Sequence, residues 1–287
     1  MTMWGDVQSS RKIYRGIRLG FGYVAFLLSV MVPQICFAGA WNLPKNEGQV
    51  IVTGVFSGGN TIFDDDGMRQ AANFSKTETR VFFEHGVTDR WTLTANGAFQ
   101  MSQFQSEGFG LGGAFNFDDF DDTEFGLRYQ LKRKQGLAVS VQASYVLDGG
   151  PPDNILDIGG SRDTVELRAL WGQSFENEKW GEVFFDAQLA GRLRVDNGKY
   201  DSTRADLTFG YKPVPKWFVF IQNFGTLREA ETSLGFTVSE QVQFKSNVSV
   251  GYEYKRNRFI QIGYSETLFG RNIVKERGAF LSTWVRY

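Results

Sequence analysis

The sequence predicts an all-β fold, a closed up-and-down antiparallel transmembrane β-barrel of about twelve strands that is preceded by a cleaved signal peptide. Three observations predict it. Segments of roughly ten residues alternate apolar and polar side chains, which is the period of a strand whose two faces meet different environments. The connections between these segments alternate between short and long, and the chain opens with a leader typical of exported proteins.

The leader consists of basic side chains between residues 11 and 18, an apolar run at 19–37 and the small residues Ala38–Ala40. This order is typical of a secretory signal, and we expect cleavage before Trp41. The alternative is a retained anchor helix, because the run approaches the ~20 residues that a span needs. Pro33 and Gln34 favour processing. The sequence therefore predicts a signal peptide at 1–40 and a single barrel domain at 41–287.

The composition excludes several classes of function. The 31 Lys and Arg residues against 32 Asp and Glu give a net charge of -1, without the basic excess that nucleic-acid binding requires. The one cysteine, Cys36, leaves with the leader, so the exported chain has no disulfide, no thiolate nucleophile and no cysteine-ligated metal. Nothing in the sequence indicates a cofactor. The 33 glycines and 15% aromatic residues favour many short strands.

Twelve segments have the alternating pattern. They are Gln49–Ser57, Phe74–Glu84, Trp91–Gln103, Asp122–Leu131, Leu137–Leu147, Thr164–Phe175, Glu182–Arg194, Thr203–Lys212, Trp217–Phe224, Gln241–Tyr254, Phe259–Leu268 and Arg277–Tyr287. Alternation also predicts their faces. Val139, Leu189 and Leu207 should face lipid, whereas Ser140 and Gln188 should face the opposite way.

The connections distinguish a barrel from a soluble sandwich, which would also alternate. Short connections are expected at 85–90, 132–136, 176–181, 213–216 and 255–258, long ones at 58–73, 104–121, 148–163 and 225–240, and intermediate ones at 195–202 and 269–276. An outer-membrane barrel has tight periplasmic turns and longer external loops, whereas a Greek-key sandwich has no reason to alternate in this way.

Aromatic residues support the same interpretation. The last strand ends at Tyr287 and resembles the C-terminal strand of outer-membrane barrels, whose terminal aromatic residue is read by the barrel-assembly machinery. Trp91, Trp180, Trp217 and Phe259 adjoin short turns, where an interfacial belt is expected. The alternative is that they are ordinary core aromatics.

Closure is required because hydrocarbon offers no partner for backbone N–H and C=O groups. An even number of strands places both ends of the barrel domain on the periplasmic side. A twelve-stranded bore is expected to be narrow, because its size lies between barrels filled by side chains and barrels that enclose an open channel.

The polar face of the strands has charges of both signs. The candidate lumen-lining residues are Glu78, Arg80, Glu84, Glu124, Arg128, Glu166, Arg168, Asp186, Arg192, Arg194, Arg204, Asp206, Lys245, Glu253 and Arg286. They form either a ladder of structural ion pairs that fills the bore or a polar constriction that filters solutes.

Groups that could carry other chemistry give weaker signals. His85, the one histidine, adjoins a short turn, whereas a hydrolase acting on outer-leaflet lipid or on an external peptide would have its site near the long loops. The acidic segments 64–66 and 117–124 could hold calcium but lack EF-hand spacing, and solvated loops explain them better. The glycines at 108–113 have no strand-to-helix context for phosphate and indicate an external loop.

The segments 40–51 and 84–91 resemble a family of outer-membrane barrels known as XagA-like. The resemblance rests on short stretches, and it implies a role near surface polysaccharide or cell attachment without supplying catalytic residues. In that family a tyrosine is expected where this chain has His85.

We therefore expect a protein of the outer membrane of a Gram-negative bacterium, in contact with lipid and the assembly machinery, that passes small polar solutes or serves the export of surface polysaccharide. The alternatives are a non-conducting structural or adhesion barrel and, third, a barrel hydrolase. Planar-bilayer recording would distinguish the first two.

Overall fold

The computed structural model describes residues 39–106, 113–149, 163–233, 236–238 and 240–287. The strands are β1 Gly48–Phe63, β2 Arg69–Gly86, β3 Trp91–Ser106, β4 Gly113–Phe120, β5 Thr123–Lys134, β6 Leu137–Leu147, β7 Thr164–Asn177, β8 Gly181–Arg194, β9 Tyr200–Val214, β10 Trp217–Arg228, β11 Glu231–Ser233, β12 Phe236–Val238, β13 Gln241–Lys255, β14 Arg258–Arg271, β15 Ile273–Val274 and β16 Arg277–Arg286. In the described residues no helix is long and apolar enough to cross a membrane.

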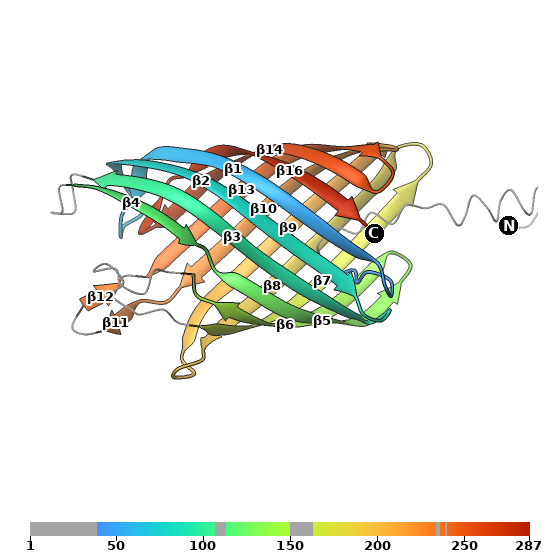
Figure 1. The fold of residues 1–287 in the computed structure, drawn as a ribbon, viewed down its shortest axis with the longest axis horizontal. Helices are drawn as coiled ribbons and strands as arrows, with labels where there is room; N and C mark the ends of the chain where they lie inside the picture. Colours follow the sequence, from blue (N-terminus) through green and yellow to red (C-terminus); the bar gives the residue numbers. More distant parts are fainter. Residues whose placement is uncertain (1–38, 107–112, 150–162, 234–235, 239) are drawn as a thin grey trace, which may run out of the picture. The chain divides into compact units, whose positions relative to one another are not determined.

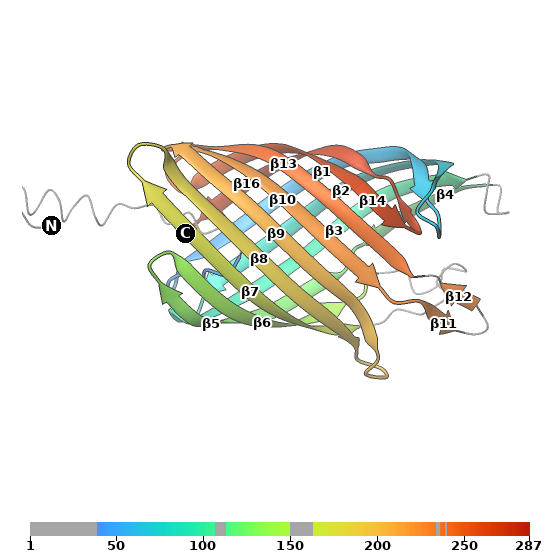
Figure 2. The ribbon, with the colours of Figure 1, turned by 180° about the vertical axis from the view of Figure 1, so that it is seen from behind.

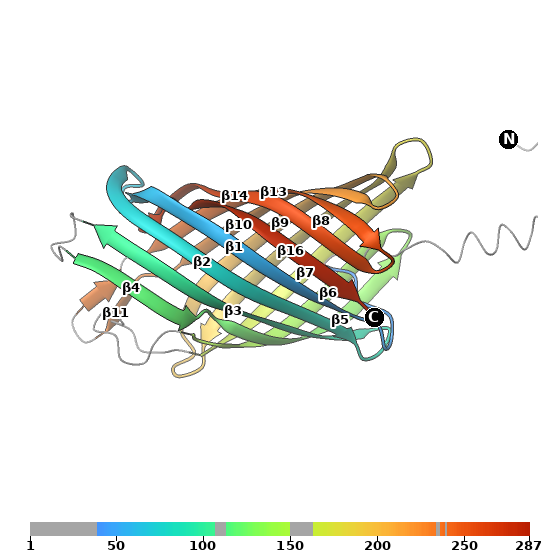
Figure 3. The ribbon, with the colours of Figure 1, turned by 45° about the horizontal axis from the view of Figure 1, so that its top comes forward.

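Twelve of the described strands close into one antiparallel barrel, as the alternation predicts. Each strand pairs with its neighbour in the chain, and β1 closes the ring because it pairs with β16 on one side and β2 on the other (Figure 3). The strands β4 and β15 extend the pairing of β3 and β1 at one end, and β11 with β12 forms a separate hairpin. Every backbone in the ring therefore has a partner on both sides, as hydrocarbon requires.

The strands agree with the twelve predicted segments, and β6 has the predicted bounds. The expected long loop at 58–73 is wrong in extent, because β1 and β2 continue to Phe63 and Arg69 around a five-residue turn at 64–68. The expected loop at 104–121 likewise contains the end of β3 and all of β4. Beyond the apolar layer these backbones keep pairing, because hydrogen bonds to a neighbouring strand satisfy them as well as water does.

The short connections and the C-terminus lie at one end of the barrel, and β4, β11 and β12 lie at the other (Figures 1 and 2). We call these the short-turn end and the long-loop end. The turn at Gln135–Gly136 joins β5 to β6 with positive φ at both residues, 48° and 81°. That conformation matches the twist of the strands and requires a residue without Cβ at the second position. The two ends therefore differ as expected for an outer-membrane barrel, with tight turns at one end and longer connections at the other.

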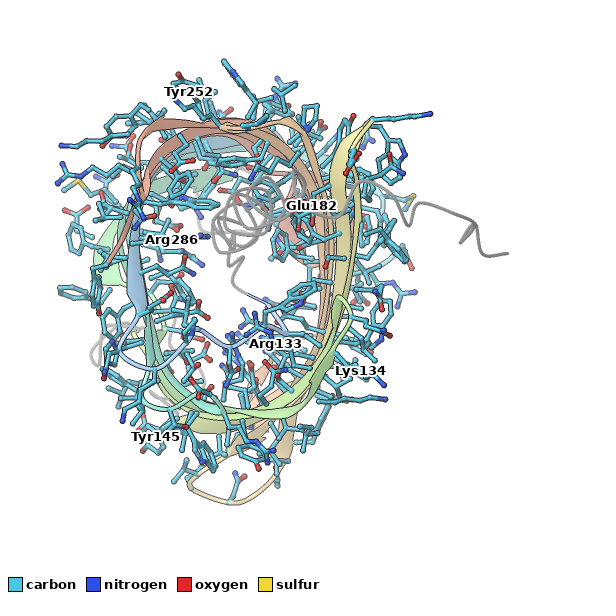
Figure 4. All side chains as sticks on the ribbon, turned by 90° about the vertical axis from the view of Figure 1, so that its right-hand side faces the viewer. Arg133, Lys134, Tyr145, Glu182, Tyr252 and Arg286 are labelled. Atoms are coloured by element: carbon cyan, nitrogen blue, oxygen red, sulfur yellow. The ribbon has the colours of Figure 1, made fainter. Side chains whose placement is uncertain are left out.

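The two faces of the wall have different chemistry. Leu189 is 58% exposed on the outer face, and Leu207 is equally open, whereas Ser140 and Asp186 are buried on the inner face. Seen along the barrel, Arg133, Glu182 and Arg286 point inward (Figure 4). The outer face is an apolar wall and the inner face is polar, which confirms the predicted register of these strands.

Candidate functional site

The charged residues that the sequence predicts to line the lumen lie on seven strands and share the polar face of each. They are Glu78, Arg80 and Glu84 of β2, Glu124 and Arg128 of β5, Glu166 and Arg168 of β7, Asp186, Arg192 and Arg194 of β8, Arg204 and Asp206 of β9, Lys245 and Glu253 of β13, and Arg286 of β16. Most are joined in networks. The contacts between strands decide which charged side chains are buried in ion pairs and which are exposed to the lumen.

Glu166 is the centre of a network that joins β7, β8 and β9. Its carboxylate is fully buried and lies 2.8 Å from Nη2 of Arg168 and 2.9 Å from Nε of Arg192. Nη1 of Arg204 lies further away, at 3.7 Å. Arg168 also contacts Asp206 at 2.6 Å. One buried carboxylate thus holds arginines from three strands in place, through charge-assisted hydrogen bonds to two of them.

The arginines of this network differ in how far they are open to the lumen. The side chain of Arg192 is 4% exposed because Asp122, 2.6 Å away, closes its other side. The side chain of Arg204 is 35% exposed, and among the described residues its one ion-pair contact is the long one to Glu166. The guanidinium of Arg204 is therefore exposed to the lumen, whereas that of Arg192 is buried in ion pairs with Glu166 and Asp122.

A second network lies toward the long-loop end around Glu276, in the segment between β15 and β16. Its carboxylate lies 2.9 Å from Nζ of Lys245 and 3.1 Å from Nζ of Lys76, and it accepts a hydrogen bond from Ser57. Burial acts to raise the pKa of Glu276, but the charges of Lys245 and Lys76 outweigh it and lower the pKa to about 2. Sequence reasoning missed Glu276, because it lies outside every alternating segment.

Most of the remaining charged residues of the inner face also have polar partners. Lys76 joins the second network to Glu78, which contacts Arg80 at 2.9 Å, and Arg80 reaches Asp121 at 3.2 Å. Arg128 lies 2.9 Å from the buried Glu84, and Arg194 lies 3.4 Å from Asp201. Gln142 donates to Glu124, and Glu253 accepts from the backbone of Asn257. Ion pairs and hydrogen bonds therefore join most of the charged side chains of the inner face, and the two interpretations of this face remain alternatives.

An aromatic cluster fills part of the interior at the short-turn end. Phe218, Phe220, Phe259 and Trp284 pack together with ring centroids 5.1–6.1 Å apart. Phe259 is 3% exposed, so the expectation that it belongs to the outer belt is wrong. It pairs across the sheet with the inward Trp284, and this register turns its ring into the barrel. Trp91, Trp180 and Trp217 are exposed on the outside.

Glycines on neighbouring strands make room for these rings. A Cβ placed on Gly251 would meet the ring of Phe218, and a Cβ on Gly210 would meet the ring of Phe184. The abundance of glycine in the sequence therefore has a packing cause in addition to its use in turns. Sequence reasoning could have found this signal by pairing inward aromatics with cross-strand glycines.

The residues before β1 lie inside the barrel at the same end. Ala40 and Asn42 are fully buried, and the amide N–H of Asn42 donates to Gln130 at 2.9 Å. Trp41 packs edge-on against Phe184, with ring centroids 6.1 Å apart, and lies over Gly172. We call residues 39–44 the N-terminal segment. Sequence analysis did not anticipate it, because it has no alternating pattern.

His85 lies at the short-turn end, where its ring stacks with Phe83 and Tyr287. Within the described residues its hydrogen-bonding contact is the hydroxyl of Tyr287, 3.4 Å from Nδ1. Among the described residues the imidazole thus contacts two aromatic rings and a phenol hydroxyl, whereas a catalytic triad places a serine-type nucleophile and a carboxylate beside it.

Several described side chains of the acidic segments accept hydrogen bonds or form ion pairs with neighbouring residues. Asp64 accepts from the side chain of Gln70, and this bond, together with backbone N–H donors, lowers its pKa. Asp121 and Asp122 pair with Arg80 and Arg192. The part of the chain that the structure describes has no group of three or more His, Cys, Asp or Glu side chains placed to hold a metal. The leader up to residue 38 and the glycines at 108–112 lie outside the described residues.

Solved structures share this architecture. The COG4313 outer membrane channel from Pseudomonas putida superposes with a TM-score of 0.64 and 16% identity, over 88% of this chain and all of that one. The translocator domain of the autotransporter NalP from Neisseria meningitidis gives 0.51 and 11% over 97% and 100% of the two chains, and the NanC porin gives 0.50 and 11% over 82% and 98%. The chain has the fold of an outer-membrane β-barrel.

No family model and no curated protein matches the sequence. The resemblance to the XagA-like family therefore remains an expectation from the sequence. At these identities the solved structures establish the fold, and the function must be argued from this chain's own residues.

Proposed function

We propose that this protein is a narrow channel of the Gram-negative outer membrane for small polar solutes, with a preference for anions. The observation that carries the proposal is the exposed guanidinium of Arg204, which faces a lumen whose other charges are largely paired. A fixed positive charge at a narrow point raises the local concentration of anions and repels cations. The side chain of Arg80 is also partly exposed, at 42%, but it contacts Glu78 and Asp121, so Arg204 is the residue on which the preference depends.

A non-conducting structural or adhesion barrel is the second candidate, and a specific observation favours it. The N-terminal segment and the aromatic cluster occupy the interior at the short-turn end, where Ala40 and Phe218 are buried. A barrel of this size can be filled by its own side chains. The two candidates therefore differ in whether solutes pass the N-terminal segment.

The role near surface polysaccharide is a further possibility that rests on the resemblance of residues 40–51 and 84–91. Sugar rings bind to exposed aromatic faces, but Phe218, Phe259 and Trp284 are buried among themselves. The open groups of the lumen are charged, which fits small ions and polar solutes better. For this reason we place the channel first.

Recording from the purified protein in a planar bilayer tests the proposal. We expect small discrete conductance steps with a reversal potential that indicates anion preference. Trp41→Ala should increase the step size, because it removes the ring that packs against Phe184. Lys134→Gln, which changes an exposed charge outside the lumen, is the control (Figure 4). A folded protein that gives no steps in either form would establish the non-conducting barrel.

A further inference from the structure

Asp186 of β8 has an unusual position among the lumen carboxylates. Its side chain is 3% exposed, Oδ1 accepts from Nε2 of Gln188 at 2.7 Å and Oδ2 accepts from the backbone N–H of Ala40 at 2.8 Å. Within the described residues it forms no ion pair, since Arg128 contacts Glu84 and Arg168 contacts Glu166 and Asp206. A buried carboxylate without a cation in contact is costly, so such a group either takes up a proton or acquires a positive charge beside it.

The residue next to this carboxylate is Gly39. A Cβ added at Gly39 would lie 2.6 Å from Oδ2 of Asp186, so the carboxylate would have to move to make room for a side chain. Asp186 therefore packs directly against the main chain of the N-terminal segment. A charge placed on the backbone nitrogen of Gly39 would lie in this neighbourhood.

The backbone of Ala40 is fixed by the barrel wall. Its carbonyl oxygen accepts from Oγ of Ser140 at 2.5 Å and from Nε2 of Gln130 at 3.0 Å. Its side chain packs with Ala138 and Leu170 in a buried apolar group. These contacts tie the backbone of Ala40 to the barrel wall, because removing Ala40 would take the acceptor from the buried hydroxyl of Ser140 and one of several acceptors from Nε2 of Gln130.

The leader offers two bonds with small residues in the first and third positions before the cut. Cleavage after Ala40 uses Ala38 and Ala40, and cleavage after Ala38 uses Cys36 and Ala38. Cleavage after Ala40 removes every contact that Ala40 makes with the barrel wall. Cleavage after Ala38 keeps these contacts and creates a new amino group at Gly39, beside the carboxylate of Asp186.

We propose that export processing cuts the bond between Ala38 and Gly39, so that the mature protein begins at Gly39 and its α-ammonium group pairs with Asp186 inside the barrel. The proposal builds on the predicted leader and is independent of conduction. In the cut, a leader endopeptidase adds water across the peptide bond: Ala38 gains the hydroxyl and leaves as a carboxylate, and the nitrogen of Gly39 becomes an amine. Near neutral pH that amine is largely protonated, more so beside a carboxylate. The cut itself thus supplies the cation that Asp186 lacks.

The direct test is N-terminal sequencing and intact mass of the protein purified from outer membranes. We expect the mature chain to read Gly-Ala-Trp-Asn-Leu. A chain that begins at Trp41, or one that keeps its leader, would overturn the proposal.

A second test uses two glycine variants and the melting temperature of the unheated barrel on gels. Gly39→Ala should lower it by several degrees, because the added Cβ displaces the carboxylate of Asp186. Gly191→Ala is the control, since its Cβ would meet Tyr200 at an ordinary 3.7 Å. If residue 39 is absent from the mature protein, Gly39→Ala cannot change its melting, and equal melting of the Gly39→Ala and unmodified proteins would refute the proposal. Neither measurement depends on conductance.

Discussion

Replacing Arg204 with Gln separates the charge that faces solutes from the charges that hold the barrel together. The guanidinium of Arg204 is 35% exposed, and its contact with Glu166 is long, 3.7 Å. An ion passing at about 5 Å through water interacts with this charge by ~0.8 kcal/mol, attractive for an anion and repulsive for a cation. Losing the charge changes the difference by ~1.6 kcal/mol, which corresponds to a roughly tenfold fall in the anion/cation permeability ratio.

The assay is the reversal potential across a planar bilayer that separates two salt concentrations. Low ionic strength is preferable, because salt screens an exposed charge over roughly 10 Å at 0.1 M. We expect the reversal potential of Arg204→Gln to move toward cation preference, with an unchanged melting transition. The stability is preserved because Glu166 keeps Arg168 and Arg192 as partners.

Arg192→Gln is the matched comparison, since it removes the same charge from the same network. Arg192 is 4% exposed and bridges Glu166 and Asp122. Its loss leaves Asp122 without this partner and weakens the pairing of a buried carboxylate, at a cost of about 3 kcal/mol. The unheated form should therefore melt earlier. If Arg204→Gln left selectivity unchanged while Arg192→Gln shifted it without loss of stability, the assignment of open and closed arginines would be refuted.

Three further predictions concern the wall and the ends of the barrel. Leu189→Arg should cost ~2–4 kcal/mol of folding free energy in bilayers, and Gln188→Arg should cost less, because only the first places a charge in lipid; equal costs would mean that the sheet is buried on both faces. Phe218→Ala should cost about 3–5 kcal/mol in a denaturant titration, because it leaves a cavity between Phe220 and Trp284, and a loss below 1 kcal/mol would contradict the aromatic cluster. Because the pKa of Glu276 is lowered in the folded protein, its contribution to stability is complete above its ordinary pKa near 4.5 and is lost as the pH falls toward about 2; Glu276→Gln should remove this acid-dependent part of the melting curve, and an unchanged curve would show that the ion pairs with Lys76 and Lys245 do not stabilise the fold.

The sequence by itself determined the barrel, its strands and the faces of most of them. Alternation is a local signal with a period of two, so each strand reveals its own inner and outer side, as in Leu137–Leu147. Closure followed from the physics of hydrocarbon. The lengths of the loops could not be predicted as well from the sequence, since β1 and β2 continue to pair beyond their expected ends.

The partners of the inward residues were decided only by the tertiary structure. The alternation placed Arg192 and Arg204 on the same inner face but could not distinguish the buried arginine from the open one, because the difference depends on Glu166 and Asp122 from other strands. The inward position of Phe259 likewise follows from its register with Trp284.

The N-terminal segment depended most on the tertiary structure. Its backbone bonds reach Gln130 and Asp186, which lie 88 and 146 residues further along the chain. No local pattern encodes such contacts, because they form only when the closed barrel brings β5, β6 and β8 around one space. The sequence specifies each strand through its own alternation, whereas the register and closure of the whole ring determine what fills its interior.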